Sequence, residues 1–207
     1  MNDGRKDGRI DGHESISRRR FIKSAVSAGI VGAAPMVIPA SAWARMHVRR
    51  RNFHHADQSA RSLSFNNLHT GERLHAVYWE HGDYVPGGLE QINYILRDYR
   101  RDEVKPIDPK LLDLLVALRT RLHTSAPYEV ISGYRSPITN AMLFNTTEGV
   151  ALHSMHVQGK AIDIHVPGRN LRTVRLAALS LHRGGVGYYP NSNFVHVDTG
   201  RVRWWMG

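Results

Sequence analysis

Two periodicities of hydrophobic residues alternate along the chain from residue 62 onward. Residues 63–69 and 74–79 alternate hydrophobic and polar side chains around a turn at 70–72, which is the pattern of a β-hairpin. After the pair Asp108-Pro109, which is typical of a helix N-terminus, five leucines recur at helical spacing and predict an amphipathic helix. The same patterns predict a helix opening at 86–88, a strand over 128–131, a helix over 137–146, a strand over 160–166, a helix over 171–182, and strands over 185–189 and 194–199 joined by a turn at 190–193.

The order of these elements indicates the fold class. Helices are concentrated in the earlier part of the domain and strands in the later part, which favours an α+β fold. We expect an antiparallel sheet with the helices packed on one side. The length from residue 62 to residue 207 suits one ordinary domain.

The first 44 residues have the pattern of an export signal. Residues 17–23 place paired arginines before an apolar residue and a lysine, as in twin-arginine signals. A weakly apolar stretch rich in Gly and Ala follows and ends in Ala42-Trp43-Ala44, which is typical of a signal-peptidase site. We predict a twin-arginine signal peptide over 1–44, either cleaved or retained as an anchor, a flexible basic leader over 45–61, and one domain over 62–207. The cleaved protein would lie in the periplasm without stable membrane insertion.

Composition limits the chemistry of the domain. The chain has 13 histidines and no cysteine, so a metal ion would have to be bound by imidazoles and carboxylates. The formal net charge of +10 would suit nucleic acid, but the chain has no helix-turn-helix pattern and no basic stretch interleaved with aromatic residues. We expect no nucleic-acid partner, and a polyanionic cell envelope matches this charge better. The sequence does not indicate an oligomeric state.

One strand of the predicted sheet has an acidic residue among hydrophobic ones. Alternation turns Asp163 to the face opposite its apolar neighbours, where a buried carboxylate is costly unless it is paired or binds metal. In the strand over 194–199, His196 and Asp198 share one face in the same way. If the two strands are adjacent, Asp163 lies beside His196, and His156 reaches them from the preceding turn. Two imidazoles and one carboxylate leave a fourth zinc position open for water, as in catalytic zinc sites.

These residues also resemble a known group of enzymes. The spacing His156-x6-Asp163 followed by a strand-borne His196 is similar to the LAS group of zinc peptidases, which includes the D-Ala-D-Ala peptidases of the M15 family. The segments 154–163, 184–189 and 194–200 resemble the murein endopeptidase K-like branch of that family. The resemblance implies a LAS/M15 fold, Zn²⁺ bound by His156, Asp163 and His196, and peptidoglycan stem peptides as substrate. It further implies hydrolysis of diaminopimelate–diaminopimelate cross-links, with D-Ala–diaminopimelate bonds as a related target.

The resemblance extends to the residues around the metal. Arg135, in a segment similar to the arginine loop of the group, is expected to hold a substrate carboxylate or to stabilise the oxyanion. Relatives carry Glu or Asp three residues before the final His ligand, but this chain has Asn193, which cannot accept a proton from water. Asp198 is then either the substitute general base or a residue that orients His196. His153 is expected to orient a ligand or to line the cleft.

Three alternatives remain after these assignments. His165 shares a face with Asp163 and is a rival ligand, which we place outside the metal shell or at the surface. A carboxypeptidase that removes a terminal D-amino acid would need a closed pocket around a free carboxylate, whereas an endopeptidase needs an open groove. A non-catalytic, zinc-containing cell-wall-binding module would bind peptidoglycan without cleaving it. Replacing Asp198 distinguishes the enzyme from the module, because only the enzyme has hydrolysis to lose.

Overall fold

The computed structural model describes residues 60–147 and 149–207. The predicted signal peptide over 1–44 and residues 45–59 of the predicted leader over 45–61 lie outside these residues, so both stay predictions, while Arg61 at the end of the predicted leader is the first residue of β1. The elements are β1 (Arg61–Asn67), β2 (Arg73–Glu80), β3 (Asp83–Tyr84), α1 (Pro86–Ile95), α2 (Pro109–Arg121), β4 (Tyr128–Ser132), α3 (Pro137–Thr146), the 3-10 helix η2 (Met155–Gln158), β5 (Ala161–His165), α4 (Leu171–Ser180), β6 (Gly185–Tyr189), β7 (Phe194–Asp198) and β8 (Arg203–Met206).

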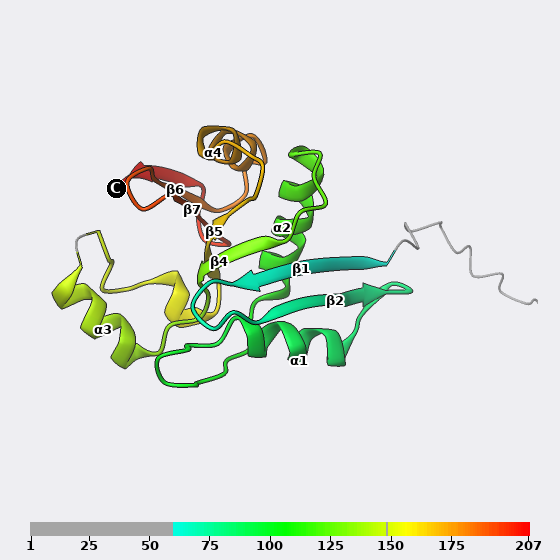
Figure 1. Cartoon of the computed structure of the whole chain (residues 1–207), viewed down its shortest axis with the longest axis horizontal. Helices are drawn as coiled ribbons and strands as arrows, with labels where there is room; N and C mark the ends of the chain where they lie inside the picture. The colour runs from blue at the N-terminus through cyan, green and yellow to red at the C-terminus, as the bar shows by residue number, and fades with distance from the viewer. Residues whose placement is uncertain (1–59, 148) are drawn as a thin grey trace, which may run out of the picture. The chain divides into compact units, whose positions relative to one another are not determined.

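The eight strands form one sheet in the order β3-β2-β1-β4-β5-β7-β6-β8 (Figure 1). Five neighbouring pairs are antiparallel, whereas β1–β4 and β6–β8 are parallel. The α+β class is therefore confirmed, but the sheet is mixed. Neither parallel pair is joined by a tight hairpin: β2, β3, α1 and α2 separate β1 from β4 in the chain, and β7 separates β6 from β8.

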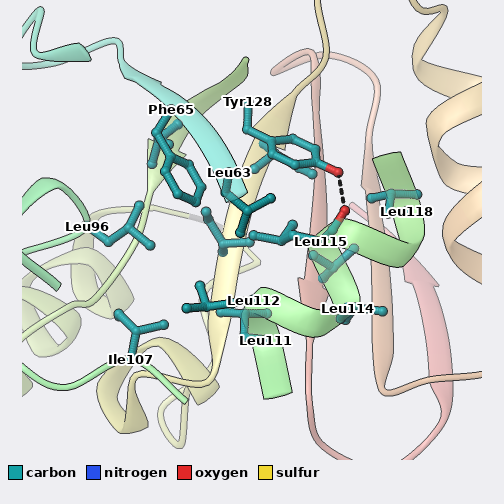
Figure 2. Close-up of a cluster of buried hydrophobic side chains, with 14 of the residues drawn as sticks. Leu63, Phe65, Leu96, Ile107, Leu111, Leu112, Leu114, Leu115, Leu118 and Tyr128 are labelled. Atoms are coloured by element: carbon teal, nitrogen blue, oxygen red, sulfur yellow. Dashed lines mark hydrogen bonds between the residues drawn. The ribbon is translucent and has the colours of Figure 1, made fainter. Parts of the chain in front are cut away.

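One face of the sheet carries the hydrophobic core. The buried side chains of α1, α2 and α4 join those of the strands in one cluster, and α2 also contacts α4. Figure 2 shows the leucines of α2 packed against Leu63 and Phe65 of β1. In the same view the Tyr128 hydroxyl donates to the carbonyl oxygen of Leu115, at 2.7 Å. Asp108 caps α2 by accepting from the backbone N–H of Lys110, as the sequence predicts.

The opposite face of the sheet borders a cavity and not the hydrophobic core. The buried residues of α3, Thr139 and Asn140, are polar and do not belong to the core cluster. Its Leu143 instead lines a cavity that also contains Asp163 of β5. The predicted packing of helices on one side therefore holds for α1, α2 and α4, while α3 borders the cavity on the opposite face. In the part of the chain that the structure describes, no helix has the length and hydrophobicity needed to cross a membrane.

Candidate metal centre

Asp163 and His196 face each other across two central strands. The antiparallel pairing of β5 and β7 matches Asp163 with His196, while Ile162 pairs with Val197 and Ile164 with Val195. Paired residues point to the same face of a sheet, so the valines and isoleucines enter the core and the two polar side chains meet on the opposite face. The alternation of the two strands is thus sufficient to bring this carboxylate and this imidazole together.

A β-bulge extends this polar row into β4. Val130 pairs with Ile164, but the register then shifts and Ser132 pairs with Asp163. Without the extra residue, Ile131 would lie opposite Asp163. The bulge instead turns the Ser132 hydroxyl to the polar face, where it accepts a hydrogen bond from Arg135 Nε at 2.8 Å. The bulge in β4 therefore supplies the hydroxyl group that holds the Arg135 side chain.

His156 completes the cluster from outside the sheet. It lies in η2, whose N-cap Ser154 accepts a hydrogen bond from the His156 backbone N–H at 3.2 Å. His156 Nε2 lies 3.2 Å from Asp163 Oδ1 and 3.2 Å from His196 Nδ1, and His196 Nδ1 lies 2.8 Å from Asp163 Oδ1. All three residues are buried. One donor atom from each can therefore converge on a single point.

The donor set fits a zinc ion. With bond lengths of about 2.0–2.2 Å, two donors of a tetrahedral zinc site lie about 3.3–3.6 Å apart. The observed separations of 2.8 and 3.2 Å are within about 0.5 Å of that range. Two neutral imidazoles and a carboxylate are also the ligand types that remain for a chain without cysteine.

The second nitrogen of each imidazole has its own acceptor. His156 Nδ1 donates to the carbonyl oxygen of Gly133 at 2.7 Å, which leaves Nε2 to face the cluster. His196 Nε2 donates to Asp198 Oδ2 at 3.0 Å, which leaves Nδ1 to face the cluster. Such outer contacts fix the tautomer and the ring orientation of metal-binding histidines. Both rings therefore have the arrangement that a metal ligand requires.

Asp198 is wholly buried and its carboxylate is fully used by neighbouring donors. Oδ1 accepts from the backbone N–H groups of Gly185 and Gly200, at 3.0 and 2.8 Å. Arg203 donates to both carboxylate oxygens, through Nη1 at 3.0 Å and Nη2 at 2.7 Å. Burial alone would raise the pKa of Asp198, but hydrogen bonds from His196, Arg203 and the two glycines hold that pKa far below its usual range.

Two glycines of β6 make room for these contacts. A Cβ on Gly185 would lie 2.3 Å from Arg203 Nη1 and 2.5 Å from Asp198 Oδ2, so a larger residue would separate the two side chains. A Cβ on Gly187 would lie 2.7 Å from the ring of Trp205. Because Gly187 pairs with His196 on one side and Trp205 on the other, the indole can lean over the sheet to 5.1 Å from the His196 ring. The absence of side chains at these two glycines therefore lets Arg203, Asp198 and Trp205 approach β6 closely.

The electrostatics of the cluster favour the metal-binding ionisation state at Asp163 and His156, whereas they favour the protonated form of His196. Burial lowers the pKa of His156, and the charge of Arg135 lowers it further, although Asp163 acts in the opposite direction. Burial would raise the pKa of Asp163, but the two imidazoles hold it well below its usual range. Burial would also lower the pKa of His196, yet hydrogen bonds to Asp163 and Asp198 raise it. Asp163 is thus an anion and His156 is neutral near neutral pH, as metal ligation requires.

A cavity of about 330 Å³ lies over the cluster. It is lined by the three clustered residues, by Arg135 and Ser132, by α3 with the residues after it, and by Tyr189, Ser192 and Phe194 at the β6–β7 turn. Arg135 Nη2 donates to Asp163 Oδ2 at 2.5 Å. Its Nη1 makes no hydrogen bond with the residues that the structure describes, so this donor remains for a ligand in the cavity.

The remaining predicted residues lie farther from the cluster. His165 is half-buried at the far end of β5, where its Nδ1 lies 2.8 Å from Glu129 Oε2, and it is outside the metal cluster. His153 is exposed and is not among the residues that line the cavity. Asn193 is exposed in the β6–β7 turn with φ of 55°, a left-handed conformation that Asn tolerates well. Sequence reasoning missed the cavity residues His69 and Arg100, because they come from loops without a motif.

Comparison with known proteins identifies the family. The family model Peptidase_M15_2, described as peptidoglycan L,D-endopeptidase MepK, matches residues 55–205. A protein of Escherichia coli (strain K12) named peptidoglycan L,D-endopeptidase MepK is 42% identical over 189 residues, covering 91% of this chain and 97% of the relative. A Haemophilus influenzae protein named probable peptidoglycan L,D-endopeptidase MepK is 46% identical over 148 residues, covering 71% of this chain and 80% of the relative. No solved structure matches the chain. The chain therefore belongs to the M15 peptidases, in the family described as peptidoglycan L,D-endopeptidase MepK.

Proposed function

We propose that this protein is a zinc-dependent endopeptidase that hydrolyses peptide cross-links of peptidoglycan. The observation that carries the proposal is the buried His156–Asp163–His196 cluster, whose donor atoms lie within 4.8 Å of one another beneath a cavity. Relatives over most of the chain are named peptidoglycan L,D-endopeptidases, which supports diaminopimelate–diaminopimelate bonds as the substrate. Their substrate also supports a site of action outside the cytoplasm, and the twin-arginine pattern supports export to the periplasm.

In this proposal the three clustered residues bind the zinc ion and the rest of the site orients them. A zinc ion in such a site supplies Lewis acidity toward the peptide carbonyl and makes water nucleophilic near neutral pH. Gly133 and Asp198 hold the imidazole rings by their outer nitrogens. Arg135 fixes the Asp163 carboxylate through one terminal nitrogen and presents the other to the carbonyl oxygen of the substrate, where negative charge develops.

Of the two roles that the sequence leaves open for Asp198, its contacts support orientation of His196. The carboxylate does not line the cavity over the cluster and is already bonded to four donor groups. Its depressed pKa also makes it a weak proton acceptor near neutral pH. His153 is too exposed to support a role in holding a ligand, and we propose no step for it.

The proposal is tested by digestion of purified muropeptide dimers with the zinc-loaded protein. The dimers carry either diaminopimelate–diaminopimelate or D-Ala–diaminopimelate cross-links, and chromatography with mass spectrometry identifies the bond that is cleaved. We expect loss of dimers with a matching gain of monomers. His156→Ala should abolish this reaction by removing a ligand, whereas His165→Ala, on β5 but outside the cluster, should leave it unchanged.

The outcomes separate the alternatives. Intact dimers at stoichiometric zinc would refute the endopeptidase. Release of terminal D-Ala without loss of dimers would then indicate the carboxypeptidase, and binding without any cleavage would indicate the cell-wall-binding module. Circular dichroism of both variants shows whether a loss of activity reflects loss of folding.

A further inference from the structure

A second cationic group lies at the cavity, and the proposed metal centre does not use it. Arg100 belongs to the connection between α1 and α2 and lines the cavity together with His69 and Arg135. Its guanidinium lies over the ring of Tyr99, with 4.4 Å between Cζ and the ring centroid. Tyr99 also stacks on His69, at a centroid distance of 4.2 Å and an interplanar angle of 14°. Aromatic contact thus holds the arginine at the cavity.

The backbone beneath Arg100 is tied to the arginine loop. The buried carboxylate of Asp98 accepts from the Arg100 backbone N–H at 3.1 Å through Oδ1. Its Oδ2 accepts from the Ser136 backbone N–H at 2.9 Å, one residue after Arg135. His69 Nε2 donates to a β4 carbonyl oxygen at 2.9 Å. Asp98 therefore links the backbone of Arg100 to the residue after Arg135, and His69 separately ties the aromatic stack to β4.

Arg100 differs from the other stacked arginines in its charge environment. Arg61, Arg97 and Arg203 also lie over aromatic rings, and each pairs with a carboxylate within 4 Å. Within residues 60–147 and 149–207, no carboxylate pairs with Arg100. Arg175 is stacked and unpaired in the same residues, but it does not line the cavity. A guanidinium held only by an aromatic ring keeps its charge and its N–H donors for a ligand.

The cavity as a whole favours an anionic ligand. Among its described lining residues, Asp163 is the only acidic one, and Arg135 pairs with it. Arg100 therefore adds an uncompensated positive charge to a lining that is not otherwise negative. Charge of one sign in a concave site attracts ligands of the opposite sign.

We propose that Arg100 forms a subsite for a free carboxylate of the substrate, on a diaminopimelate residue that flanks the bond to be cleaved. This inference rests on the proposed function. Diaminopimelate has two carboxyl groups, and a peptide cross-link leaves a free carboxylate on the residue that contributes the amine. A guanidinium can bind such a carboxylate with two parallel hydrogen bonds. Arg100 would contact the substrate, while Tyr99 and Asp98 would position Arg100.

The test compares two substrates and two variants. The substrates are a diaminopimelate–diaminopimelate cross-linked dimer with free carboxylates and the same dimer with these groups amidated. Arg100→Ala should raise KM for the free-carboxylate dimer about 10- to 100-fold, the effect expected for lost hydrogen bonds between charged groups, with little change in kcat. For the amidated dimer, wild-type and variant KM should be equal. Arg101→Ala removes the same charge from an exposed neighbour that does not line the cavity, and it should behave as wild type.

Amidation of one side of the cross-link at a time identifies the carboxylate. The subsite is supported if one of these amidations removes the effect of Arg100→Ala, and that carboxylate is then the one bound. Equal KM of the wild type for free and amidated dimers would overturn the subsite, as would an equal effect of Arg100→Ala on both. Failure of the wild type to cleave any dimer would instead overturn the proposed function. Zinc content of each variant shows that the metal centre is intact.

Discussion

Replacement of Asp198 by Asn probes how the outer contacts control the metal ligand. The amide is close in size to the carboxylate but carries donors at one end. If its oxygen keeps the backbone N–H groups of Gly185 and Gly200, its NH₂ takes the place of Oδ2. The NH₂ then faces two donors, His196 Nε2 and Arg203 Nη2. The clash with His196 is relieved if the His196 proton moves to Nδ1, and the guanidinium of Arg203 must shift away. Nδ1 is the atom that faces Asp163 and His156, so the change of tautomer blocks the metal-binding nitrogen.

The expected loss of zinc affinity in Asp198→Asn follows from the hydrogen bond that His196 loses. A buried donor without an acceptor costs about 1–3 kcal/mol, and loss of an outer contact commonly lowers metal affinity about 10- to 100-fold, or about 1.4–2.7 kcal/mol. We therefore expect zinc affinity of Asp198→Asn to fall about 10- to 100-fold, measured by competition with a chromogenic chelator. At saturating zinc, kcat should recover to near the wild-type value. A general base could not recover in this way.

The matched control is Glu129→Gln. Glu129 and His165 form another carboxylate–imidazole contact on the same sheet, at 2.8 Å, outside the metal cluster. This variant should bind zinc as the wild type does. Wild-type zinc affinity in a folded Asp198→Asn protein would refute the argument from tautomers, and lost kcat at full zinc occupancy would return Asp198 to the role of general base.

Three further predictions concern folding and metal binding. Burial would raise the pKa of Asp98, but hydrogen bonds from the α3 N-terminus and nearby backbone lower it. Its charged form thus stabilises the fold above the unfolded pKa of about 3.9, and this contribution is lost as pH falls through the folded pKa. Asp98→Asn should therefore make the free energy of unfolding, measured with urea, less dependent on pH in the acid range. An unchanged dependence on pH would contradict this. Gly133→Ala would place a Cβ 2.4 Å from a backbone oxygen and should lower the free energy of unfolding by about 1–3 kcal/mol. The control Gly87→Ala, whose Cβ would have no atom within 4 Å, should not lower it. Equal thermal stability of the two variants would contradict this prediction. Zinc should change the fluorescence of Trp205, whose ring lies 5.1 Å from the ring of His196. Trp205→Phe should therefore remove most of the zinc-dependent signal, whereas Trp204→Phe, which replaces an exposed tryptophan, should retain it. The reverse result would refute the binding of zinc beside Trp205.

The part of the site that depends on local pattern could be predicted from the sequence. A strand of period two that carries Asp163 among hydrophobic residues, and a later one that carries His196, must turn these side chains away from the core if the strands are buried. Pairing of β5 with β7 then places them together. His156 was predicted from its spacing and from the family resemblance. The α2 helix was predicted for a similar local reason, since its cap and leucine spacing lie within one segment.

The parts that depend on register and distant contacts could not be predicted. The bulge that turns Ser132 toward Asp163 arises from the pairing of β4 with β5, and nothing in the residues of β4 alone specifies it. Strand β8 is short and was not predicted, although it brings Arg203 to Asp198. The position of Arg100 at the cavity depends on loop packing, which hydrophobic periodicity does not describe.

The central claim is that one metal ion in the His156–Asp163–His196 cluster is required for cleavage of peptidoglycan cross-links. The most direct test removes metal from the purified protein with a chelator, adds zinc in steps, and measures both bound zinc and the rate of dimer cleavage. We predict that the rate rises in proportion to bound zinc and stops rising at about one ion per chain. Full cleavage by the metal-free protein, or full zinc occupancy without cleavage, would contradict the account.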